Sequence, residues 1–153
     1  MAEDVSPADA ARTALTWFRA QHGEAADLRA SAAVRVVRLD DPTRGYLLVP
    51  IRDDAGLCGI VQIDLHTGEV ETSARIADPS SAFLFPSAQA LAAARAARPR
   101  LSDWGTPHLG WRPCKESFDA MRPLWVVPHG GGVVYVDQDG RVFDTLTVSG
   151  RGG

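Results

Sequence analysis

Hydrophobic residues recur at helical spacing near the start of the chain. Ala11, Ala14, Leu15 and Phe18 follow the i, i+3, i+4, i+7 pattern of an amphipathic helix, and Trp17 lies beside them. Ser6 stands where an N-cap is expected, directly before a proline at the first helical position. Gly23 stands where a left-handed residue commonly ends a helix. The pattern therefore predicts a helix over residues 7–22.

Strand-like segments follow this helix, separated by clusters of turn-forming residues. The predicted strands are 33–39, 45–51, 57–65 and 69–76. Gly68 can supply the positive φ of the turn between the last two strands. Pro50 has no N–H for a ladder, so we expect it at an edge, a bulge or a strand end. The order predicts a helix followed by an antiparallel meander.

The same order then starts again. Ser87 is expected to cap an alanine-rich helix that runs to Arg98 and ends before Pro99. Residues 100–122 have no clear periodicity. The strands predicted for this half are 108–115, 123–128, 133–137 and 141–148.

The two halves can be aligned with each other. Residues 46–50 match residues 124–128, because both are apolar strands that close with Val-Pro. The hairpin over 60–70 matches the hairpin over 133–142 in the same way. We predict an α+β fold of two helix-plus-antiparallel-sheet (α-β-β-β) units related by an internal pseudo-repeat. The predicted ranges are 1–78 for the first unit, 79–148 for the second and 149–153 for a flexible tail, with one compact domain as the alternative.

The hairpins also resemble a known family. Ile63-Asp64-Leu65-His66-Thr67-Gly68-Glu69-Val70 is similar to the hairpin of PepSY domains, and Val136-Asp137-Gln138-Asp139-Gly140-Arg141-Val142 is similar but one residue shorter. The first 76 residues are similar in layout to YrhB-type bacterial immunity proteins. The resemblance implies a cystatin-like fold, a binding or inhibitory role, and no catalytic residues.

Composition narrows the possible partners. Apolar residues make up 45% of the chain and charged residues 23%, which is typical of a globular protein. The net charge of −3 disfavours nucleic acid and anionic membranes as partners. An acidic start without an apolar segment favours a cytoplasmic location. Cys58 and Cys114 are expected as free thiols, with a disulfide or a reactive thiol as alternatives.

No catalytic or metal-binding motif is complete. His129-Gly130-Gly131-Gly132 is similar to an oxyanion-hole sequence, but the chain has no G-x-S-x-G serine. Asp137-Gln138-Asp139-Gly140 begins like a calcium loop, yet Val148 occupies the twelfth position, where a glutamate is required. The four histidines form no i, i+4 pair. We therefore predict no enzyme activity, no metal and no cofactor.

Aromatic residues gather in the second half of the chain, where they are expected either in the core or on a partner surface. Tryptophan and tyrosine are over-represented at binding hot spots, which favours the surface. The predicted partner-binding residues are Trp104, Trp111, Arg112, Phe118, Trp125 and His129. The predicted function is a non-catalytic bacterial protein that binds or inhibits another protein, as an immunity protein does with a toxin. The alternative is a small-molecule binder or an enzyme with a cleft between the two halves.

Overall fold

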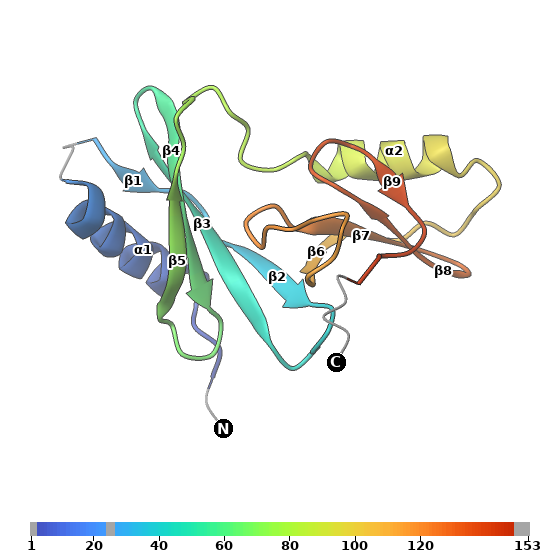
Figure 1. The fold of residues 1–153 in the computed structure, drawn as a ribbon, viewed down its shortest axis with the longest axis horizontal. Helices are drawn as coiled ribbons and strands as arrows, with labels where there is room; N and C mark the ends of the chain where they lie inside the picture. Colours follow the sequence, from blue (N-terminus) through green and yellow to red (C-terminus); the bar gives the residue numbers. More distant parts are fainter. Residues whose placement is uncertain (1–2, 24–26, 149–153) are drawn as a thin grey trace. The chain divides into compact units, whose positions relative to one another are not determined.

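The computed structural model describes residues 3–23 and 27–148. These residues form two helices and nine strands, and their contacts divide the chain into two compact units (Figure 1). The first unit comprises Met1–Val37 with Asp41–Phe83, and the second Arg38–Asp40 with Leu84–Gly153. The α+β class predicted from the sequence is confirmed. The predicted tail, 149–153, lies outside the described residues.

The first unit is a helix followed by antiparallel strands. Its elements are α1 (Pro7–His22), β1 (Arg29–Ala30), β2 (Val34–Arg38), β3 (Gly45–Asp53), β4 (Gly56–Asp64) and β5 (Val70–Arg75). The strand order is β5-β4-β3-β2, and β1 pairs with β3 beyond the end of β2. The predicted meander is confirmed, whereas β1 was not predicted, because two residues carry no readable periodicity.

Helix α1 forms as the sequence predicts. The Ser6 hydroxyl accepts a hydrogen bond from the Asp9 N–H at 3.1 Å, and Gly23 ends the helix with a φ of 87°. Ala10, Ala14 and Phe18 are buried against β3 and β4. The core of this unit therefore lies between α1 and one face of the sheet.

Pro50 lies within β3, where its missing N–H is harmless. Strand β2 pairs with β3 as far as Leu48, and β1 begins to pair at Ile51, so this edge of β3 has a gap at Pro50. The Pro50 carbonyl still accepts a hydrogen bond from the Ser31 N–H at 2.9 Å. The proline therefore marks the break between β1 and β2.

The second unit also consists of a helix and antiparallel strands. They are α2 (Ser87–Ala97), β6 (His108–Trp111), β7 (Leu124–His129), β8 (Gly132–Val136) and β9 (Val142–Phe143). The strands are antiparallel in the order β6-β7-β8-β9. Ala90 and Ala94 of α2 are fully buried against Val127, Val134 and Val136, because small side chains let the helix approach the sheet closely.

Three sequence predictions for this unit are wrong. The strand predicted over 108–115 ends at Trp111. Ser87 is the first residue of α2 rather than its cap, and Pro86 precedes it without a side-chain capping bond. The final strand ends at Phe143 instead of residue 148. The chain leaves the ladder after β9 because Thr147 bonds to the loop at residues 115–116 instead.

Candidate functional site

A hollow of about 400 Å³ lies on the surface of the second unit. It is lined by the loop over residues 115–119, by Arg122, and by the residues of the β8–β9 hairpin between 137 and 141. Charged side chains line most of it. We treat this hollow as the candidate functional site because it combines polar side chains that are hydrogen-bonded in place with an exposed aromatic ring.

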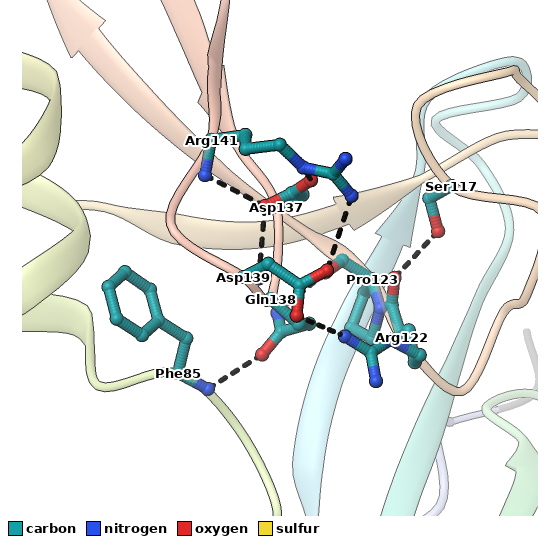
Figure 2. Close-up of polar contacts among 8 residues, drawn as sticks. All are labelled: Phe85, Ser117, Arg122, Pro123, Asp137, Gln138, Asp139 and Arg141. Carbon is teal, nitrogen blue, oxygen red and sulfur yellow. Dashed lines mark hydrogen bonds and ion pairs between the residues drawn. The ribbon is translucent and has the colours of Figure 1, made fainter. Parts of the chain in front are cut away.

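Asp137 anchors the β8–β9 hairpin, which forms one wall of the hollow. Only 4% of this residue is exposed. Its carboxylate accepts hydrogen bonds from the N–H groups of Asp139 and Arg141 at 2.9 Å and from the Arg141 Nε at 2.8 Å (Figure 2). Gly140 completes the turn with a φ of 83°. The turn is therefore held by charge-assisted bonds on its inner side.

Two arginines converge on a second carboxylate at the rim. Figure 2 shows Asp139 between Arg122 and Arg141, whose guanidinium groups lie 3.1 Å and 3.2 Å from its oxygens. All three side chains are more than half exposed. Such exposed ion pairs contribute little to the stability of the fold, but they hold both guanidinium groups at defined positions.

Gln138 ties the hairpin to two other segments. Its side-chain oxygen accepts the Phe85 N–H at 2.7 Å, and its amide nitrogen donates to the Pro123 carbonyl at 2.6 Å (Figure 2). The segment before α2 and the start of β7 are thereby fixed to the same turn. Little rearrangement of this wall is expected when a ligand binds.

The opposite wall is also bonded internally. The Glu116 carboxylate accepts hydrogen bonds from the Thr147 N–H and hydroxyl at 2.8–3.0 Å. Burial raises the pKa of Glu116, but these bonds outweigh it and place the pKa below its ordinary value. The Ser117 hydroxyl donates to the Arg122 carbonyl at 2.6 Å. The loop that carries Phe118 is thus anchored on both sides of the phenylalanine.

The predicted partner-binding residues lie in different surroundings. Phe118 is 80% exposed and lines the hollow. Trp104 and His129 are partly buried and in contact, with their ring centroids 5.5 Å apart. Arg112 is partly buried, and among the described residues its Nε has no hydrogen-bond partner.

The other two predicted tryptophans belong to the packing of the unit. Trp111 is 8% exposed, and its indole N–H donates to the Ser117 carbonyl at 3.2 Å. Trp125 is partly buried and donates to the Phe85 carbonyl at 2.7 Å. In both tryptophans, the indole N–H is therefore hydrogen-bonded to a backbone carbonyl of the same unit.

Sequence reasoning did not select Arg122, Asp137, Asp139 or Arg141. The sequence of residues 137–140 predicts only a hairpin turn, and no residue nearby in the chain indicates that this turn faces the loop at 115–122. The sequence feature that could have indicated this site is the high density of charged residues in the segments 115–122 and 137–141.

The two cysteines are free thiols, as predicted. Burial and the nearby Asp53 carboxylate raise the pKa of Cys58, whose thiol donates to the Ile51 carbonyl at 3.2 Å. Burial also raises the pKa of Cys114. Both groups are therefore protonated at neutral pH and are poor nucleophiles.

Within residues 3–23 and 27–148, no three His, Cys, Asp or Glu side chains are grouped closely enough to hold a metal ion. No helix in the described part of the chain has the length and apolar character needed to cross a membrane. Comparisons with models of protein families, with curated proteins and with solved structures find no match to this chain.

The Asp137 carboxylate gives a first prediction about the hollow. Asp137→Ala is expected to lower the free energy of unfolding by about 2–3 kcal/mol, because it removes several charge-assisted bonds from a buried acceptor. Asp139→Ala, two residues further along the same turn, is the matched control and should lower the free energy of unfolding by less than about 1 kcal/mol. Urea denaturation of both variants measures the difference, and equal losses would contradict the role assigned to Asp137.

Proposed function

We propose that this chain is a non-catalytic bacterial protein that binds and inhibits another protein, and that the hollow beside Phe118 is its binding surface. The observation that carries the proposal is the 80% exposure of Phe118 on an internally bonded loop. An isolated large apolar ring in water gains about 1.5–3 kcal/mol when a partner buries it. A loop that is already held in place loses little conformational entropy on binding.

The surroundings of Phe118 also suit a protein partner. Protein interfaces commonly place an aromatic anchor inside a polar rim, and this rim carries both signs of charge. The charged residues that line the hollow are Lys115, Glu116, Asp119, Arg122, Asp137, Asp139 and Arg141. We expect the partner to offer an apolar pocket for the ring, with charged groups around it.

The similarity between the units supports the further proposal that they are a PepSY-like internal repeat. Each has one helix packed on its sheet and the same order of four antiparallel strands. In each unit, a proline carbonyl in the second of these four strands accepts a backbone hydrogen bond at 2.9 Å: Pro50 from the Ser31 N–H, and Pro128 from the Gly105 N–H. A repeat of this kind, together with an inhibitory role, would place the chain with cytoplasmic immunity-type proteins that neutralise toxins.

The test is partner capture from a lysate of the source bacterium with the immobilised full chain. Phe118→Ala should reduce the specifically captured protein at least tenfold. Val133→Ala is the matched control, because Val133 is another exposed apolar residue of the same unit, at 37% exposure. It should leave capture unchanged.

The same experiment can overturn the assignment. Thermal unfolding first establishes that each variant is folded. Undiminished capture by Phe118→Ala would remove the hollow as the binding surface. Loss of capture with Trp104→Ala alone would move the surface to the Trp104–His129 contact.

A further inference from the structure

The acidic side chains that line the hollow are already hydrogen-bonded within the second unit. Both carboxylate oxygens of Glu116 accept bonds from an N–H and a hydroxyl group. Both oxygens of Asp137 and both of Asp139 accept bonds from the β8–β9 turn or from the arginines at the rim. Among the described residues that line the hollow, only Asp119 keeps a carboxylate oxygen without a hydrogen bond, because its other oxygen accepts a backbone N–H at 2.8 Å.

The basic side chains of the hollow, in contrast, keep donors that are not used. Within residues 3–23 and 27–148, the Lys115 side chain has no ion pair or hydrogen bond, and it is exposed. To the same residues, Arg122 donates through Nη2, and Arg141 donates through Nε and Nη2. Figure 2 shows the remaining terminal nitrogen of each arginine directed away from Asp139. The unused hydrogen-bonding groups of the hollow are therefore mainly cationic donors.

We propose that the partner places an acidic side chain against these donors, next to the apolar pocket that receives Phe118. This inference rests on the proposed function and adds the sign of the partner's charge. A carboxylate accepts short, charge-assisted bonds from guanidinium and ammonium groups. A lysine or arginine of the partner would instead need acceptors, and nearly all carboxylate oxygens in the hollow already accept a bond.

The formal charges of the lining do not by themselves give this preference. Four carboxylates and three cations line the hollow, a net charge of −1. At contact distance, however, an arriving ion loses water, and it gains stability only if it finds groups that can bond to it. The available bonding groups therefore decide which ion is accepted, and here they are donors.

Asp139 has two opposing effects on such a site. Its carboxylate holds Arg122 and Arg141 at the rim, at 3.1 Å and 3.2 Å. Its negative charge also repels a second carboxylate that approaches the same two arginines. Removing the charge while keeping the size and an acceptor oxygen, as in Asp139→Asn, should therefore strengthen the binding of an acidic group.

The binding of three small probes to the full chain, followed in amide NMR spectra, tests the inference. Benzoate combines a carboxylate with an apolar ring that can pack against Phe118. Benzamide and benzylammonium are the matched neutral and cationic probes. At equal ionic strength, benzoate should bind at least about threefold more tightly than either, which is the effect expected of an exposed ion pair. Its largest shifts should fall on the loop that carries Phe118.

Charge variants identify the groups responsible. Arg122→Gln should remove the preference for benzoate, while its backbone carbonyl still accepts the Ser117 hydroxyl and keeps the loop anchored. Asp139→Asn should tighten benzoate binding by about twofold or more. Arg100→Gln makes the same substitution at an exposed residue of the second unit outside the hollow, and it should leave the binding of all three probes unchanged.

The inference and the proposed function fail by different results. Equal binding of the three probes, no binding of any, tighter binding of benzylammonium, or an unchanged preference in folded Arg122→Gln would overturn the inference. Undiminished partner capture by Phe118→Ala would overturn the proposed function. Capture that depends on Phe118, without a preference for benzoate, would leave the binding surface in place and exclude an acidic group of the partner.

Discussion

Gly59→Ala is expected to destabilise the first unit by about 3 kcal/mol, a cost close to that of deleting a buried aromatic ring. A Cβ atom on Gly59 would lie 2.2 Å from Cε2 of Phe18 and 3.1 Å from the Ala74 carbonyl oxygen. Phe18 is 3% exposed and packs in the core beneath α1, so its ring cannot move aside without opening that core. Denaturation in urea measures the loss.

A smaller residue at position 18 should relieve the clash. In Phe18→Leu/Gly59→Ala, the two substitutions should cost at least about 1 kcal/mol less than the sum of the single variants, because they act on the same contact. Gly131→Ala is the control, since the nearest atom to its Cβ is the His129 Cε1 at an ordinary 3.5 Å. Additive losses in the double variant would show that the clash is not the cause.

The sequence predicts those elements whose signals are local. Helix α1 carries its cap, its proline and its terminal glycine within the helix and its flanking residues, and its observed bounds match the prediction. Strands β3 and β4 are rich in apolar and β-branched residues and are separated by turn residues, so the sequence also predicts their positions. In both cases residues close in the chain determine the structure.

Features that depend on distant residues were not predicted. The last strand looked longer because Asp144 to Val148 continue an alternating pattern, but Glu116, about thirty positions earlier, bonds to Thr147 and ends the ladder. The hollow needs the segments 115–122 and 137–141 to meet. Aromatic composition selected Trp111 and Phe118 alike, because a sequence without periodicity does not show which ring faces inward.

The second large effect is expected at Trp111. Trp111→Ala should lower the free energy of unfolding by about 3–5 kcal/mol, since it removes a buried ring and leaves a cavity. The Arg38 guanidinium lies 5.1 Å from the centroid of this ring, and the Ser117 carbonyl accepts its N–H. Trp111→Phe keeps a ring in the site and loses the hydrogen bond, so its cost should be smaller, about 1–2 kcal/mol. Urea denaturation separates the two variants.

The same pair of variants distinguishes a packing role from a binding role for Trp111. Ser117 precedes Phe118, so an unfolded Trp111→Ala chain would lose partner capture whether or not the tryptophan touches the partner. Trp111→Phe stays folded and leaves Phe118 in place, and it should therefore capture the partner as the unmodified chain does. Loss of capture by folded Trp111→Phe would mean that the indole itself contacts the partner, which its 8% exposure argues against.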